Sequence, residues 1–404
     1  MSEARDAGPL AGITVLDCTI WQNGPFATVM LSDLGADVIK VEDRETGDPG
    51  RGFMDAGSDS GVSGYFEAMN RNKRSVTLDL KSPDGKALFH RLAGKADVVV
   101  QNFRLGVAEK LGIGYADLEP LNPRLVYASA TGFGREGPDA GVGVFDILGQ
   151  ARSGVMHALR KPGDPIEYNN AFGLADQTGG ILLAQAIVTA LYARERTGTG
   201  QEVEVSQLGA MLVLQQMGLT RHLINGYDPA MAERGEPKNP VFNTYRCAGG
   251  EWIAVGGLQG DRYWPDFCAC LGLEALGQDP DFATMAARTA ASRDIVARLD
   301  EAFAGFACAD LLASFTEAGI PCAPVNSYED VARDPQVRAN GYIVEVEHPH
   351  LGTIGEIGMP MRFGGNTPPP CRAAPELGQN TEEVLLEFGL TWDEIVDLRE
   401  KGAI

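Results

Sequence analysis

Short apolar runs alternate with helical patterns along the first half of the chain. Runs rich in β-branched residues predict strands at residues 13–16, 37–41, 75–80, 97–101 and 125–129, and helical spacing predicts helices at 26–34 and 85–93. Strands that alternate with helices of this length are typical of a doubly wound parallel sheet. The sequence therefore predicts an α/β fold that binds ligands in the loops after Leu16, Val41 and Gln101, at the carboxyl ends of strands.

The second half of the chain follows a different pattern. A strong helix is predicted at residues 180–194 and a strand at 202–205, and a polar connection rich in Gly and Pro follows at 225–240. A hairpin is expected around Gly249-Gly250, and helical segments continue until Gly319-Ile320-Pro321 breaks the pattern. We therefore expect residues 225–325 to form a smaller inserted α+β domain. Two short helices separated by Gly389 are expected at 380–403.

Length and composition favour a globular enzyme of two domains. The chain has 404 residues, 44% of them apolar. The longest apolar stretch, 180–193, falls short of the ~20 residues that a membrane-spanning helix needs, and the N-terminus lacks the pattern of a signal peptide. A cytoplasmic protein is expected. Seven scattered cysteines favour reduced thiols, and the spacing of Cys and His gives no metal motif.

The net charge of −21 opposes binding to nucleic acid or to an anionic membrane. One segment is positively charged although the whole chain is negative. Residues 71–110 contain nine Lys and Arg and four Asp and Glu, which gives this segment a net charge of +5. This basic segment suits a small polyanionic ligand. Charge alone favours a solvated helix face equally well.

A dinucleotide-type glycine motif runs from Gly132 to Gly137 directly after a predicted strand. The sequence Pro138-Asp-Ala-Gly that follows cannot begin a helix, so no helix N-terminus is available for a pyrophosphate. An NAD-dependent dehydrogenase therefore stays a remote alternative. The sequence contains neither a Walker motif nor a G-x-S-x-G elbow.

Asp176 stands in the sequence Gly173-Leu-Ala-Asp-Gln-Thr-Gly-Gly180, directly before the predicted long helix. From spacing alone the favoured role is a helix N-cap. A nucleophilic carboxylate is compatible with that position, because a helix N-terminus would keep the carboxylate ionised.

Motifs along nearly the whole chain resemble the class III CoA-transferases, the group also named after carnitine CoA-transferase and the bile-acid-inducible protein. The N-terminal ones are 10–17, Gly24-Pro25, 34–42, Gly47-Asp48, 72–75, Asn102-Phe103 and 121–124, and the later ones are 197–201 and 319–325. The resemblance implies a Rossmann-like large domain built from residues 1–224 and 326–404, a small domain at 225–325, and two interlocked subunits forming a homodimer.

The resemblance also implies the chemistry. Asp176 stands where the family has its nucleophilic aspartate, which carries coenzyme A between carboxylic acids through mixed anhydrides and an aspartyl-CoA thioester. The expected partners are an acyl-CoA and a small carboxylic acid. Coenzyme A enters as part of a substrate, and no permanently bound cofactor is expected.

Further positions match the family's site. Gln22 and Asn23 match residues near the CoA thiol and the carboxylate intermediates, and Gly256 and Gly257 match a mobile lid that excludes water. The residues that match the CoA-contacting stretch are Leu78, Lys81, Asn102, Phe103 and Lys110. Phe53, Tyr65, Phe145 and Gln259 are expected at the substrate pocket, although Phe53 and Tyr65 are of types that more often belong simply to a core. An arginine that contacts CoA in formyl-CoA transferase is replaced by Asp43.

Two substitutions disfavour the related α-methylacyl-CoA racemases, which share this resemblance. Phe145 stands where a racemase has the histidine that takes a proton, and Gln259 stands where it has an acidic partner. Neither side chain is a base. Racemisation stays the alternative, and a catalytically silent CoA-binding subunit stays a more remote one.

Overall fold

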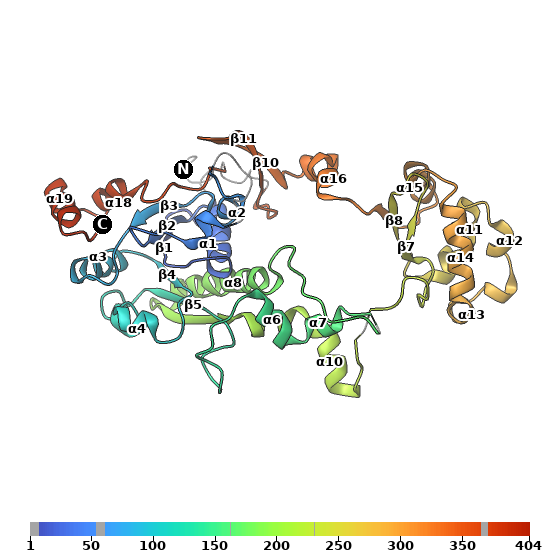
Figure 1. Ribbon diagram of the computed structural model, residues 1–404, viewed down its shortest axis with the longest axis horizontal. Coiled ribbons are helices and arrows are strands. Elements are labelled where there is room, and N and C mark those ends of the chain that lie inside the picture. The colour runs from blue at the N-terminus through green and yellow to red at the C-terminus, as the bar shows by residue number, and fades with distance from the viewer. Residues whose placement is uncertain (1–7, 54–60, 162, 230, 365–370) are drawn as a thin grey trace. The chain divides into compact units, whose positions relative to one another are not determined.

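The chain divides into two units, one built from three separate segments (Figure 1). The computed structural model describes residues 8–53, 61–161, 163–229, 231–364 and 371–404. The larger unit comprises Met1–Ala158, Ile166–Pro229 and Pro335–Ile404, and the smaller one Leu159–Pro165 and Ala230–Asp334. Compared with the expected 225–325, the smaller unit begins five residues later, ends nine residues later and gains the segment 159–165. Its first segment joins it because the backbone N–H of Met231 donates to the carbonyl of Arg160 (3.3 Å).

A six-stranded parallel sheet forms the centre of the larger unit. The order is β3-β2-β1-β4-β5-β6, and every neighbouring pair is parallel. The strands are β1 (Thr14–Asp17), β2 (Asp37–Glu42), β3 (Arg74–Thr77), β4 (Val98–Gln101), β5 (Val126–Thr131) and β6 (Gln201–Ser206). This Rossmann order confirms the predicted α/β class and places a topological switch point between β1 and β4.

Alternate side chains of the strands point into two apolar layers. Val15, Val38 and Val98 pack against α1 (Asn23–Asp33) and α8 (Leu174–Thr197). Leu16 and Val99 face the opposite layer. The helices of that layer are α3 (Pro83–Ala93), α4 (Val107–Leu111), α5 (Tyr115–Leu118), α18 (Thr381–Glu387) and α19 (Trp392–Glu400). The C-terminal segment therefore completes the core that the N-terminal segment begins.

The remaining elements of the larger unit surround this sheet. They are η2 (Pro49–Gly52), α2 (Gly64–Asn70), α6 (Asp146–Ser153), α7 (Val155–Ala158), α9 (Gln207–Leu214), α10 (Gln216–Asn225), α17 (Pro335–Ala339), β10 (Ile343–His348) and β11 (Gly352–Ile357). β10 and β11 form an antiparallel hairpin.

Helix α8 begins six residues before the predicted start at 180. Gly179 and Gly180 do not break it, because they allow α1 to approach closely: a Cβ on Gly179 would overlap the amide of Asn23, and one on Gly180 would lie 2.9 Å from the Asn23 carbonyl oxygen. By length and composition α8 could cross a membrane. A core helix passes the same test, and Leu183 and Ile187 of α8 are fully buried against the sheet.

The smaller unit has an antiparallel sheet and its own aromatic core. The strands β7 (Phe242–Arg246), β8 (Trp252–Gly256) and β9 (Cys322–Pro324) pair in that order. The expected turn joins β7 to β8 with Gly249 and Gly250 at positive φ. Its helical elements are α11 (Gly260–Cys270), α12 (Glu274–Gly277), η3 (Pro280–Phe282), α13 (Met285–Ala290), α14 (Ser292–Phe303), α15 (Cys308–Glu317) and α16 (Tyr328–Arg333). Phe303 stacks on Tyr245 with 4.3 Å between ring centroids.

Candidate active site

A cavity of about 390 Å³ opens at the switch point of the sheet. Its walls come from the loop after β1, the loop after β4, the long loop after β5, and the starts of α8 and α9. The lining residues include Trp21, Gln22, Asn23, Asn102, Phe103, Arg104, Gly132, Gly143, Phe145, Asp176 and Gln207. Ligands of open parallel sheets bind in this place, so the cavity is the candidate active site.

Asp176 reaches this cavity from the first turn of α8. The predicted N-cap role is wrong, because the N-cap residue is Gly173 and the Asp176 carboxylate accepts a hydrogen bond from Nε2 of Gln207 instead. Gln207 opens α9 directly after β6. Its Oε1 is buried and has no hydrogen-bond partner within the described part of the chain. A carboxylate and an amide thus lie side by side at the edge of the cavity.

Asp146 does the capping that Asp176 was expected to do. Its Oδ1 accepts from the backbone N–H groups of Ala175 (2.6 Å) and Asp176 (3.0 Å), and its Oδ2 accepts from Gln150 and from the hydroxyl of Tyr168. A carboxylate that satisfies the first-turn amides fixes the start of a helix. Asp146 is therefore a positioning residue that holds Asp176 in place from the neighbouring helix α6.

The electrostatics of Asp176 differ from the expectation of a fully ionised carboxylate. Burial, followed by the negative charge of Asp146, raises the pKa of Asp176 to about 7, while the hydrogen bond from Gln207 lowers it. The helix N-terminus does not keep the pKa of Asp176 low, because the backbone N–H groups of Ala175 and Asp176 already donate to Asp146. A carboxylate with a raised pKa is a stronger base and nucleophile once it is ionised.

Gln22 and Asn23 tie the loop after β1 to the start of α8. Nε2 of Gln22 donates to the carbonyl of Phe172 (3.0 Å), and Nδ2 of Asn23 donates to the backbone carbonyl of Asp176 (3.2 Å). Gly173 sits at φ +66°, and a Cβ there would overlap the Gln22 amide. Each amide nitrogen carries a second N–H, so both side chains keep a donor for a ligand.

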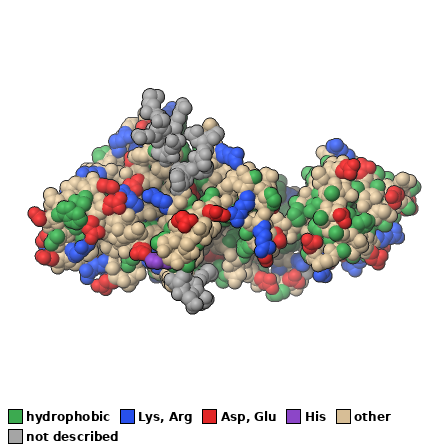
Figure 2. Space-filling model, turned by 90° about the horizontal axis from the view of Figure 1, so that it is seen from above, with side chains coloured by type: hydrophobic (Ala, Val, Ile, Leu, Met, Phe, Trp, Pro, Cys, Tyr) green, Lys and Arg blue, Asp and Glu red, His purple; other side chains and the backbone are tan. Residues whose placement is uncertain are grey.

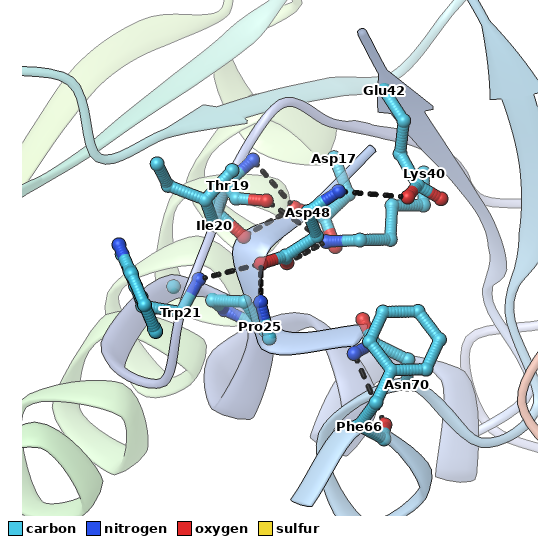
Figure 3. A network of polar contacts seen from close by, with 12 residues as sticks. Asp17, Thr19, Ile20, Trp21, Pro25, Lys40, Glu42, Asp48, Phe66 and Asn70 are labelled. Carbon is cyan, nitrogen blue, oxygen red and sulfur yellow. Dashed lines mark hydrogen bonds and ion pairs between the residues drawn. The ribbon is translucent and has the colours of Figure 1, made fainter. Parts of the chain in front are cut away.

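The preceding residue, Trp21, has a left-handed backbone (φ +65°) that non-glycine residues rarely adopt. Its N–H donates to Oδ1 of Asp48 (3.1 Å), whose other oxygen pairs with the buried Lys40 (2.8 Å; Figure 3). Lys40 also donates to the carbonyl of Thr19 (2.9 Å). This buried network over-determines the loop and stabilises the strained residue.

Four aromatic rings run in a row past the cavity. Phe145 meets Trp21 (6.2 Å between centroids), Trp21 meets Phe53 (5.6 Å), and Phe53 meets Tyr65 (5.0 Å), each edge to face. The charges of Asp176 and Asp48 contribute, after burial, to a raised pKa of the Tyr65 hydroxyl. Phe145 and Trp21 line the cavity, whereas Phe53 and Tyr65, which were expected in the acyl pocket, continue the row outside its lining. Segment 54–60, which follows Phe53, lies outside the described residues.

The expected CoA-contacting residues divide into two groups. Asn102 and Phe103 line the cavity, and Asn102 is anchored by two hydrogen bonds with the backbone of Ile20 (2.7 and 3.0 Å). Leu78, Lys81 and Lys110 do not line it. Leu78 is a core residue, and the two lysines are exposed. Asp43, the expected departure from the family, lies near enough to Lys81 for that cation to contribute to its lowered pKa, after its hydrogen bond with the Thr46 backbone.

The basic segment 71–110 is not one free basic patch. Arg71 pairs with Asp33, Lys73 with Asp17, Arg74 with Asp37, and Arg91 with Glu394. Blue and red side chains are interspersed on the face that Figure 2 draws. Within the described residues, ion pairs are absent only at Lys81, Lys86, Lys95, Arg104 and Lys110 of this segment. The expectation of a ligand site thus rests on a few of the nine cations.

Three predicted site residues lie in the smaller unit. Gly256 ends β8, Gly257 follows it, and the exposed Gln259 is the N-cap residue of α11. The backbone N–H groups of Gly256 and Gly257 donate to Pro321 and Val241. A Cβ on Gly257 would lie 2.5 Å from Cγ1 of Val241, so the site requires glycine for packing.

The glycine motif at 132–137 is confirmed not to be a dinucleotide fingerprint. The next helix, α6, begins only at Asp146, and no helix N-terminus follows Gly137. Gly132 instead lies against Val144, where a Cβ would overlap the valine side chain. Within the described residues, no group of three or more His, Cys, Asp and Glu could hold a metal ion.

The sequence did not single out Trp21, Arg104, Asp146 and Gln207. Trp21 directly precedes Gln22, which the sequence did single out. Gln207 follows a predicted strand at its carboxyl end, where ligands are expected. These two sequence positions were the signals from which Trp21 and Gln207 could have been found. The contacts that make Asp146 and Gln207 important reach Asp176 from 30 and 31 residues away and are set only by the fold.

A carboxylate held at the switch point of a Rossmann-type sheet is typical of an enzyme site. The model of CoA-transferase family III matches residues 10–381. An acyl-CoA transferase of Fusarium pseudograminearum (strain CS3096) is 36% identical over 415 aligned residues, covering 100% of this chain and 90% of its own. The succinate–glutarate CoA-transferase of Agrobacterium fabrum (strain C58) is 35% identical, covering 94% and 96%.

A crystal structure agrees with these relatives. A CaiB/BaiF family protein from Brucella suis has a TM-score of 0.86 at 31% identity, with 95% of this chain and 100% of that one covered. The chain belongs to CoA-transferase family III, and it is a CoA-transferase.

Proposed function

We propose that the protein transfers coenzyme A from an acyl-CoA to a carboxylic acid through a covalent intermediate on Asp176. The observation that carries the proposal is the placement of the Asp176 carboxylate in the cavity, fixed by Asp146 at its backbone and by Gln207 at its side chain. A fixed carboxylate of raised pKa is suited to attack a thioester.

The first half of the proposed reaction makes an enzyme thioester. An Asp176 oxygen attacks the thioester carbonyl, the C–S bond breaks, and a mixed anhydride and CoA thiolate result. The thiolate then attacks the Asp176 carbonyl carbon, and the first acid leaves with the bridging oxygen, which came from Asp176. The amides of Gln22 and Gln207 are placed to donate to the developing negative charge.

The second half of the proposed reaction repeats these steps in reverse order with the acceptor acid. The acceptor carboxylate attacks the aspartyl-CoA thioester, and a second anhydride and CoA thiolate form. Attack of the thiolate on the acceptor carbonyl gives the new acyl-CoA and restores Asp176, which keeps one oxygen from the acceptor. No proton is gained or lost overall, since each nucleophile is an anion and each leaving group becomes one.

The walls of the cavity have separate roles in this proposal. Asn102, Phe103 and Arg104 on the loop after β4 hold the thiol arm of CoA, and the exposed Lys81 and Lys110 attract its phosphates. An anhydride is readily hydrolysed, so water must be excluded during turnover. The family resemblance alone assigns that task to Gly256 and Gly257, as a lid.

A homodimer of interlocked subunits is part of the same proposal. Several apolar side chains of α9 and α10 are exposed, among them Val213 (54%), Met217 (80%) and Ile224 (76%). Apolar surface of this kind favours a subunit interface. We place the enzyme in the cytoplasm, as the sequence predicts.

Racemisation receives no support from the cavity. Proton exchange beside a thioester needs an acid and a base on the two faces of the reacting carbon. Among the described residues that line the cavity, Asp176 is the sole carboxylate, and the phenyl ring of Phe145 stands where a racemase has its base.

Trapping of the intermediate tests the proposed function. The full-length protein is incubated with an acyl-CoA, treated with hydroxylamine, and digested for mass spectrometry. A hydroxamate at Asp176 is expected, together with loss of transfer in Asp176→Ala while the protein remains folded by circular dichroism. A protein that binds CoA but forms no adduct would be the silent binding subunit.

A further inference from the structure

The aromatic row beside Asp176 carries information about which acids the enzyme takes. Phe145, Trp21 and Phe53 present rings to one another edge to face, and Phe145 and Phe53 remain 60% and 40% exposed. Trp21 and Phe145 line the cavity, and Phe53 continues the row outside its lining. Large apolar side chains exposed in and beside a cavity are typical of a binding surface for an apolar group.

The backbone conformation of Trp21 also supports a binding surface at the aromatic row. Its left-handed backbone is strained, and a buried carboxylate, Asp48, and a buried cation, Lys40, are both engaged to hold it. Strain held in place by a dedicated network marks a functional position. The result is an indole ring fixed between Phe53 and Phe145, in the wall of the cavity that contains Asp176.

Cations near this row are already occupied. Lys40 and Lys73 have fully buried side chains paired with Asp48 and Asp17. Arg51 forms two hydrogen bonds with Glu42 and stacks on Phe66 at 4.0 Å.

One cation, Arg104, lines the cavity within the described residues; it comes from the loop after β4 and reaches the loop that carries Phe145. The guanidinium of Arg104 lies against Gly143, within 2.9 Å of where a Cβ would be. The proposed function assigns this loop to CoA. A second carboxylate on the substrate, placed against the rings of Trp21 and Phe145, would lose part of its hydration there and gain no hydrogen bond or ion pair from the rings, which is unfavourable.

We infer that the acids exchanged by this enzyme are monocarboxylic acids with an apolar body, branched or aromatic, which lies against Trp21, Phe53 and Phe145. Acids with a second carboxylate are discriminated against. This inference rests on the proposed function, since the reacting carboxyl group is placed by Asp176. It separates this chain from the relative whose name gives succinate and glutarate as substrates.

The test compares matched donors on the full-length protein. Isovaleryl-CoA and phenylacetyl-CoA are compared with succinyl-CoA and glutaryl-CoA, and the second-order rate constant for forming the Asp176 adduct is measured by intact mass. We expect the apolar donors to react at least about tenfold faster, the order of magnitude by which a pocket distinguishes such groups. Equal or faster reaction of succinyl-CoA or glutaryl-CoA would overturn the inference and point to Arg104 as the partner of the second carboxylate.

A charge placed in the row gives the reciprocal test. Phe145 is 60% exposed, so Phe145→Lys should fold, and its ammonium should shift the ratio toward succinyl-CoA by about tenfold. The control is Trp392→Lys on α19, an aromatic residue of similar exposure (59%) outside the cavity lining, which should leave the ratio unchanged. An unchanged ratio in folded Phe145→Lys counts against the inference. Failure of all four donors to form an adduct would instead refute the proposed function on which it rests.

Discussion

The carboxyl group of Asp176 is subject to two opposing influences. Burial and the charge of Asp146 raise its pKa to about 7, and the hydrogen bond from Gln207 acts in the other direction. Only the ionised form is nucleophilic. We therefore expect kcat/KM for the acyl-CoA to fall as the pH falls below about 7, by about tenfold per pH unit at the acid end. A stopped-flow pH profile of adduct formation checks this, and a profile flat down to pH 5 would contradict it.

Two substitutions should move this profile in opposite directions. Gln207→Leu removes a donor that stabilises the charged form, so the acid limb should shift to higher pH. Asp146→Asn removes a negative charge beside the carboxyl group, so the limb should shift to lower pH, even if the maximal rate also falls because a cap is weakened. A shift in the same direction for both variants would show that they act through general loss of structure.

At the scale of elements, a buried ion pair joins β1 to the turn before β3. The ammonium group of Lys73 makes three hydrogen bonds, to Oδ2 of Asp17 (2.9 Å), to the carbonyl of Pro25 (3.1 Å) and to Oδ1 of Asn70 (2.9 Å). Burial opposes ionisation of Asp17, yet Lys73 and Lys40 hold the pKa of that carboxyl below its usual range. The link between the end of β1 and the turn before β3 thus depends on paired charges.

Loss of this pairing should be costly. Lys73→Met leaves a buried carboxylate short of a partner, and we expect the free energy of unfolding to fall by about 3–5 kcal/mol. Urea unfolding followed by circular dichroism measures it. The exposed Lys81→Met is the control, with an expected change within about 0.5 kcal/mol. A similar small effect for Lys73→Met would mean that the pair contributes no net stability.

The elements themselves were largely predictable from the sequence, and the reasons are local. Strand runs such as Val98-Val99-Val100 are apolar on both faces, and the predicted α/β alternation matches β1 to β6. The start of α8 was placed six residues too late, at Gly180, whereas Gly179 and Gly180 lie inside the helix and their lack of a side chain serves the contact with Asn23. Glycine looks the same in sequence whether it bends the chain or admits a neighbour.

The site was less predictable than the elements. The family resemblance led to Asp176, Gln22 and Asn102, and the fold brings all three to one cavity. The cap from Asp146, the hydrogen bond from Gln207 and the strained ring of Trp21 depend on contacts between segments distant in sequence. Propensity and spacing carry no information about such contacts, so these residues emerge only from the structure.

At the scale of the whole molecule, the proposed interlocked homodimer makes a strong prediction. Subunits linked like rings cannot separate without unfolding, whatever the concentration. When tagged and untagged dimers are mixed under native conditions, we therefore expect no mixed dimers, and mixed dimers should appear after joint unfolding and refolding. Analytical ultracentrifugation checks that the species is a dimer, and rapid exchange in the native state would contradict interlocking.

The route of the carboxylate oxygens tests the central claim most directly. In the proposed mechanism Asp176 gives one oxygen to the departing acid and takes one from the acceptor in every turnover. With an acceptor acid labelled with ¹⁸O in both carboxylate positions, mass spectrometry of the digested enzyme should find heavy oxygen in the peptide that contains Asp176. The new acyl-CoA should retain one label. If the acceptor attacked the donor thioester directly, the lost label would appear in the released acid. An unlabelled Asp176 after many turnovers would contradict the account.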